Sequence, residues 1–148
     1  MRSFSVAARG TTKASPKVVW ELVADAPQYA RWGPWDRSGY EGAARGVGHT
    51  RALRRGHTTT VEKVVELEEQ KRLVYTVLKG LPVRNYRAEV SLGRVPSGTE
   101  ITWSARWDRT IRGWFVEKAL RRFFPQMMGQ LVAAADQAAT ATTTVAQI

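Results

Sequence analysis

The chain has 148 residues, of which 43% are hydrophobic and 24% charged, and its formal net charge is +10. This length suits one domain with a substantial core, and the lack of cysteine excludes disulfides, a thiolate nucleophile and a cysteine-ligated metal. The basic balance favours anionic partners such as nucleic acid or acidic lipid. Because no known nucleic-acid-binding motif accompanies it, we interpret the charge mainly as a solvated basic surface.

The first part of the chain predicts a strand and a short helix. Residues 4–13 (FSVAARGTTK) alternate and are rich in residues that favour strands. Ser15 and Pro16 are a typical helix start, as N-cap and first helical residue. The helix should end near Asp25, because Pro27 disfavours helix in the residue before it. The aromatic residues 28–35 (QYARWGPW) should close the edge of the core.

The middle of the chain predicts an antiparallel sheet. Glycine-rich residues 39–48 separate a weak strand from a second one near residues 49–55, and short turns then separate four further strands. The expected strands are Thr58–Leu67, Arg72–Lys79, Val83–Arg94 and Thr99–Trp107. In the last two strands apolar and polar residues alternate, which predicts one buried and one solvated face.

A long amphipathic helix is expected over roughly Arg112–Ala139. Its apolar stripe recurs every four residues at Phe115, Ala119, Phe123, Met127 and Leu131. Pro125 lies within this stretch and should kink the helix or divide it in two. Residues 140–148 should form a frayed tail. The whole chain is therefore expected to be a single α+β domain.

Parts of the sequence resemble a known superfamily. Residues 14–25 (ASPKVVWELVAD) and 29–32 (YARW) resemble the opening of START-like proteins, and within them the polyketide cyclase/dehydrase-like, or SRPBCC, branch. Residues 46–48 (GVG), 64–75 (VVELEEQKRLVY) and 98–103 (GTEITW) match later parts of that pattern in order. The resemblance implies a helix-grip fold, in which a curved antiparallel sheet wraps around a long C-terminal helix and encloses a cavity for a small apolar molecule.

The candidate ligand-binding residues lie on the concave face of the sheet and the inner face of the long helix. They are Arg84, Tyr86, Trp103, Trp107, Phe115, Phe123, Met127 and Leu131. Arg84 and Tyr86 are two apart on one expected strand, so they should point the same way and could orient a carboxylate, phenol or enolate. The alternative places Arg84 beyond the sheet edge in water and Tyr86 in the core.

The sequence contains no catalytic motif. His49 and His57 should lie near strand ends in solvent, and two histidines eight residues apart without a carboxylate cluster do not form a metal site. Glu62, Glu66, Glu68 and Glu69 are expected on a solvated face. We therefore expect neither a metal nor a cofactor, and the catalytic residues, if there are any, stay unassigned.

Three functions are compatible with these features. The first is a cytoplasmic protein that binds a small hydrophobic or aromatic molecule, lipid-like or polyketide-like, between sheet and helix. The second is an aromatase/cyclase-type enzyme that positions a polyketide and stabilises an enolate through Arg84 and Tyr86. The third is a protein- or RNA-contacting module similar to the ribosome-associated toxin branch of the superfamily, supported only by the charge of +10. No window is apolar enough to span a membrane.

Overall fold

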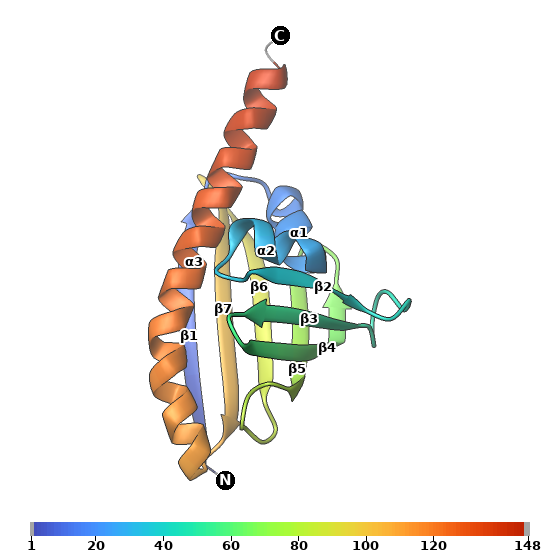
Figure 1. The fold of residues 1–148 in the computed structure, drawn as a ribbon. Helices are drawn as coiled ribbons and strands as arrows, with labels where there is room; N and C mark the ends of the chain where they lie inside the picture. Colours follow the sequence, from blue (N-terminus) through green and yellow to red (C-terminus); the bar gives the residue numbers. More distant parts are fainter. Residues whose placement is uncertain (1, 147–148) are drawn as a thin grey trace.

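The structure, a computed structural model, describes residues 2–146, and side chains as far as residue 141. The described residues have an α+β fold (Figure 1). Its elements are β1 (Ser3–Thr12), α1 (Pro16–Ala24), the short 3-10 helix η1 (Ala26–Gln28), α2 (Tyr29–Trp32), β2 (Arg37–Glu41), β3 (Thr50–Arg55), β4 (Thr58–Glu68), β5 (Arg72–Lys79), β6 (Arg87–Val95), β7 (Gly98–Asp108) and α3 (Ile111–Ala146).

All seven strands form one antiparallel sheet in the order β1-β7-β6-β5-β4-β3-β2. The sheet curves so strongly that β2, β3 and β4 run across the front of β5 and β6 in Figure 1. This arrangement with a long C-terminal helix is the predicted helix-grip architecture. The predicted alternation is confirmed, because Trp103 and Trp107 are buried while Arg106 between them is exposed.

Helix α1 follows the predicted local signals. Ser15 caps its N-terminus by accepting a hydrogen bond from the Val18 N–H, and Pro16 is the first helical residue. The helix ends at Ala24, with Asp25 already in extended conformation. Together with α2, it covers one end of the curved sheet (Figure 1).

Helix α3 has 36 residues, which corresponds to about 54 Å. It packs along the whole of β1, where a Cβ added to Gly10 would lie 2.7 Å from Val132 Cγ2. The expected division into two helices at Pro125 is wrong, because one helix continues through this residue. A frayed tail was expected over residues 140–148. The backbone is instead helical as far as Ala146, and residues 147–148 lie outside the described residues.

The strand boundary that differs most from its prediction is the start of β6. Strand β6 begins at Arg87 instead of Val83, because Asn85 adopts a left-handed conformation with φ of 54° that a strand cannot continue through. Residues 80–86 therefore form a loop. Among the described helices, none is both long and apolar enough to cross a membrane.

Candidate functional site

A cavity of about 430 Å³ lies between the concave face of the sheet and α3. Its walls come from α2 and the loop after it, from strands β3, β4, β5 and β7, from the β5–β6 loop, and from one side of α3. The lining is mostly apolar and aromatic, as expected of a site for a small molecule. The residues are Tyr29, Trp35, Leu53, Arg55, Thr58, Thr60, Glu62, Tyr75, Leu81, Tyr86, Trp103, Ala119, Leu120, Phe123, Phe124 and Met127.

The sheet side of the cavity is an aromatic wall held by hydrogen bonds. Trp103 donates from its indole Nε1 to the Tyr75 hydroxyl at 3.1 Å. Trp107 stacks on Tyr86 with ring centroids 5.8 Å apart and donates to the Gly113 carbonyl, which fixes the start of α3 against the sheet. Burial raises the pKa of both Tyr75 and Tyr86 above the usual tyrosine value. Both hydroxyls therefore remain protonated donors at neutral pH.

The structure brings together four of the eight sequence-predicted ligand residues. Tyr86, Trp103, Phe123 and Met127 line the cavity. Trp107 is fully buried beside it and acts as the support of Tyr86. The other three residues lie elsewhere.

Phe115 and Leu131 lie beyond opposite ends of the cavity. Phe115 is exposed at the start of α3, and Leu131 is fully buried in the core. Arg84 is exposed in the β5–β6 loop, so the expected shared direction of Arg84 and Tyr86 is wrong. The cause is the turn at Asn85, which interrupts the alternation that the prediction assumed.

A buried ion pair borders the cavity, and it was not foreseen as part of the site. Arg51 Nε donates to Glu62 Oε1 at 3.0 Å, and the two side chains are 0% and 11% exposed. Glu62 also lines the cavity. Burial raises the pKa of the Glu62 carboxyl, an effect that the Arg51 guanidinium partly offsets.

The position of Glu62 corrects the expectation that the glutamates of β4 share a solvated face. Two register irregularities interrupt the pairing of β4 with β5, between Val61 and Glu62 and between Val64 and Glu66. Such bulges reverse the side on which later side chains lie. Thr58, Thr60 and Glu62 alternate regularly and all line the cavity, so Glu62 points inward. The second irregularity adds Val65 to β4, and Glu66 beyond it lies on the outer face, where it pairs with Arg72 and Arg87.

Arg51 is held by the end of α1 as well as by Glu62. Its guanidinium lies over the rings of Tyr29 and Tyr75, at 4.6 and 4.9 Å from their centroids. Both Arg51 Nη1 and the Tyr29 hydroxyl donate to the Val23 carbonyl in the last turn of α1. A cation is favourable at this helix end. Burial also raises the pKa of Tyr29 to about 12.

The sequence did contain a signal for this pair. Arg51 is two residues before the buried Leu53 on β3, and Glu62 is two residues before the buried Val64 on β4. Because residues two apart in a strand lie on the same face, both charged side chains share a face with buried residues. They also lie directly opposite each other in the register. Opposite charges at facing positions of two strands are a favourable pair.

The prediction for His49 is also wrong. Its side chain is buried, and its Nδ1 lies 2.6 Å from the Gly46 carbonyl, while the ring packs against Tyr40. Burial lowers the pKa of His49, so it is neutral near pH 7. It does not line the cavity, whereas His57 is exposed as expected. Among the described residues, no group of three or more histidine, aspartate or glutamate side chains could hold a metal.

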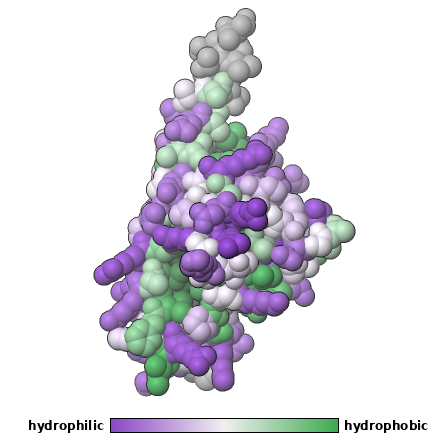
Figure 2. Space-filling model, in the orientation of Figure 1, coloured by the Kyte–Doolittle hydropathy of each residue, from purple (hydrophilic) through white to green (hydrophobic). Residues whose placement is uncertain are grey.

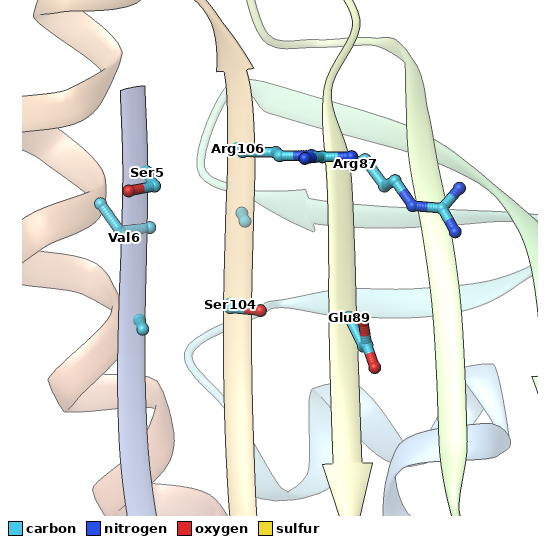
Figure 3. A pocket seen from close by; sticks show the side chains of 8 residues that line it. Ser5, Val6, Arg87, Glu89, Ser104 and Arg106 are labelled. Atoms are coloured by element: carbon cyan, nitrogen blue, oxygen red, sulfur yellow. The ribbon is translucent and has the colours of Figure 1, made fainter. Parts of the chain in front are cut away.

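A second hollow lies on the outer face of the sheet and has a different chemistry. Figure 3 shows Ser5, Ser104 and Glu89 beside the two arginines Arg87 and Arg106, on strands β1, β7 and β6. Arg87 and Arg106 face each other in the register, and Arg87 pairs with Glu66. This charged surface does not suit an apolar ligand.

The curved sheet, the long helix and the cavity between them define a ligand-binding module of the helix-grip type. The chain belongs to the family described as polyketide cyclase / dehydrase and lipid transport, whose model matches residues 3–139. No curated protein matches the chain. The family and the fold are thus those that the sequence resemblance implied.

Solved structures share the fold at low sequence identity. XoxI from Bacillus cereus is 17% identical with a TM-score of 0.74, over 90% of this chain and 95% of that one. Protein MLL2253 from Mesorhizobium loti is 17% identical with a TM-score of 0.75, over 90% and 98%. A protein from Thermobifida fusca is 24% identical with a TM-score of 0.74, over 93% and 95%. At these identities the comparison establishes the architecture alone.

Proposed function

We propose that the protein binds one small, neutral, apolar or aromatic molecule in the cavity between the sheet and α3. The observation that carries this proposal is the cavity of about 430 Å³ with its aromatic wall and few polar groups. A volume of this size accommodates a molecule of several fused or linked rings. The family description, which includes lipid transport, supports the same class of ligand.

Glu62 gives this ligand a preferred orientation. A carboxylate has about four acceptor positions, and the bond from Arg51 Nε uses one of them on Oε1. A bound molecule can therefore donate a hydroxyl or N–H to Glu62 while its rings pack against Trp103 and Phe123. Because Arg51 already neutralises the carboxylate, the ligand needs no charge of its own.

The test is a fluorescence titration with N-phenyl-1-naphthylamine, a neutral aromatic probe with one N–H donor. Ala119 is exposed yet lines the cavity, so Ala119→Phe should narrow the opening without disturbing the core. Ala133→Phe, at an exposed position of the same helix, is the matched control. We expect saturable one-to-one binding that Ala119→Phe abolishes and Ala133→Phe retains. Equal binding by both variants, or none by the wild type, would refute the proposal.

The polar end is tested with a second pair of variants. Glu62→Gln should weaken probe binding by roughly tenfold, the usual effect of losing a hydrogen bond to a charged group. Glu66→Gln removes the same charge from the outer face of the same strand and should leave binding unchanged. If both variants bind equally, Glu62 does not orient the ligand.

A second candidate function is a cyclase-type enzyme, favoured by the raised pKa of Glu62 beside the protonated Tyr86 hydroxyl. A carboxyl with a raised pKa is a stronger base than an ordinary glutamate and can accept a proton from a bound molecule. In this version Glu62 is the general base, and of the two residues that the sequence suggested for stabilising an enolate only Tyr86 lines the cavity. A poly-β-ketone analogue that binds to Glu62→Gln normally but is converted only by the wild type would favour the enzyme over the carrier.

A further inference from the structure

Three large apolar side chains are exposed at the start of α3. Ile111, Trp114 and Phe115 are 82%, 42% and 62% exposed, and we call them the rim cluster. They are contiguous, because Ile111 lies one helical turn before the other two and the rings of Trp114 and Phe115 are 4.9 Å apart. Figure 2 shows hydrophobic surface gathered at this lower end of the molecule, where α3 begins in Figure 1. A single exposed apolar residue is ordinary, whereas a contiguous group points to a partner.

The rim cluster lies next to the opening of the cavity. Ala119 and Phe123, one and two turns beyond Phe115 on the same side of α3, both line the cavity, and Ala119 is exposed. On the other side of the opening, the guanidinium of Arg55 lies over the Phe123 ring, 5.3 Å from its centroid. A surface that covered the rim cluster would thus also face the entrance of the cavity.

Cations surround the rim cluster. Lys118 Nζ lies 4.0 Å from the centroid of the Trp114 ring. The backbone N–H groups of Asp108 and Arg109 donate hydrogen bonds to the carbonyls of Arg84 and Arg2, which brings these two arginines to the same end of the molecule. The side chains of Arg2, Arg84, Arg109 and Arg112 are all exposed at this end. The first turns of α3 and the two residues before them carry the cations Arg109, Arg112, Lys118, Arg121 and Arg122, and a single acid, Glu117, which pairs with Arg121.

We propose that the rim cluster docks the protein on an anionic lipid surface, with the opening of the cavity facing that surface. Tryptophan, phenylalanine and isoleucine enter the boundary between headgroups and acyl chains, and the surrounding lysine and arginine side chains pair with anionic headgroups. A second copy of the chain is a poorer partner, because a symmetric contact at this end would bring like charges together. Nucleic acid offers phosphates to the cations but no apolar phase for Ile111.

The experiment is co-sedimentation of the full chain with vesicles of phosphatidylcholine, with and without phosphatidylglycerol, at low and at high salt. We expect binding only to the vesicles that contain phosphatidylglycerol, and weaker binding at high salt because the charges are screened. Trp114→Ala/Phe115→Ala should lower the binding by roughly tenfold or more. Val47→Ala/Leu67→Ala removes two exposed apolar side chains, from the β2–β3 loop and from the β4–β5 end of the sheet, and should leave the binding unchanged.

A second set of variants tests the charges. Arg112→Gln/Lys118→Gln should weaken binding to the anionic vesicles more than Arg37→Gln/Arg94→Gln, which removes two exposed charges elsewhere. Equal effects of the two charge pairs, equal binding to both kinds of vesicle, or no binding at low salt would each overturn the proposal.

Two further outcomes assign the rim cluster to another partner. A dimer in sedimentation equilibrium that Trp114→Ala/Phe115→Ala dissociates would show that it binds a second copy. Retention on single-stranded RNA that the same variant loses, without vesicle binding, would show that it binds nucleic acid. Probe binding in the cavity should be unchanged in this variant, so failure of the docking proposal is distinguishable from failure of the ligand proposal.

Discussion

Replacing Arg51 by methionine removes the cation from the buried pair but keeps a side chain of similar length. Arg51 Nε and Glu62 Oε1 are 3.0 Å apart, and the side chains are 0% and 11% exposed. At this distance and an effective dielectric constant of about 20, the attraction is about 5.5 kcal/mol. Measured losses on removing one partner of a buried pair are about 3–5 kcal/mol, because the other charge stays buried without compensation. We therefore expect Arg51→Met to lower the free energy of unfolding at pH 7 by about 3–5 kcal/mol.

The stability of Arg51→Met should also depend on pH. Without Arg51, the pKa of Glu62 in the folded state rises further above its unfolded value of about 4.3. A raised folded pKa means a contribution to stability that is full below the unfolded pKa and is lost as the pH rises through the folded one. The double variant Arg51→Met/Glu62→Gln, in which Glu62 cannot titrate, is the reference. Relative to it, the single variant should be most stable below about pH 4 and lose stability as the pH rises toward 7.

The assay is urea denaturation followed by tryptophan fluorescence at several pH values. The matched control is Lys71→Met, which breaks the exposed pair with Glu68 and should change stability by less than about 0.5 kcal/mol. At pH 7 the double variant should recover most of the loss seen in Arg51→Met. A loss below about 1 kcal/mol in Arg51→Met, or a double variant as unstable as the single one, would show that the pair is not a strongly coupled buried unit.

Two further predictions concern the contact between β1 and α3. Gly10→Ala should destabilise the fold by about 1–3 kcal/mol in thermal or urea unfolding, since the new Cβ would lie 2.7 Å from Val132 Cγ2. Gly39→Ala, where a Cβ meets only open space, is the control and should be nearly neutral. The Thr12 hydroxyl donates to Asp136 at 2.5 Å and lowers the pKa of that carboxyl. This contribution to stability is present above the unfolded pKa of about 3.9 and is lost as the pH falls through the folded value. Thr12→Val should therefore raise the pKa of Asp136 in an NMR titration, and an unchanged value would contradict the assignment.

Much of the fold could be predicted because its elements follow local rules. Ser15 and Pro16 mark the start of α1, and the alternation around Trp103 assigns the inner face of β7. These signals depend on residues close together in the chain. Pro125 shows where local rules fail: proline removes one backbone hydrogen bond, yet α3 continues, because packing along the whole of β1 stabilises the helix on both sides of it.

The site was harder to predict, because it depends on irregularities in the strands. One left-handed residue, Asn85, separates Arg84 from Tyr86, and one bulge of β4, at Val65, separates Glu62 from Glu66. A single irregular residue reverses the face of every side chain beyond it, and the alternation of apolar and polar residues does not reveal it. Part of the aromatic lining, such as Trp103 and Phe123, was found because large apolar residues in a periodic pattern are a strong signal. Tyr29, Trp35, Tyr75 and Phe124 were not among the predicted residues. The buried charges were missed because charged residues are ordinarily exposed.

Native mass spectrometry of the protein purified from its own host tests the central claim most directly. The cavity of about 430 Å³ should retain its small molecule through purification. We predict a one-to-one non-covalent adduct of small-molecule mass on the wild type and on Ala133→Phe, and its absence on Ala119→Phe, whose side chain narrows the opening. Identical bare masses for all three proteins, or an adduct that Ala119→Phe keeps, would contradict a ligand held between the sheet and α3.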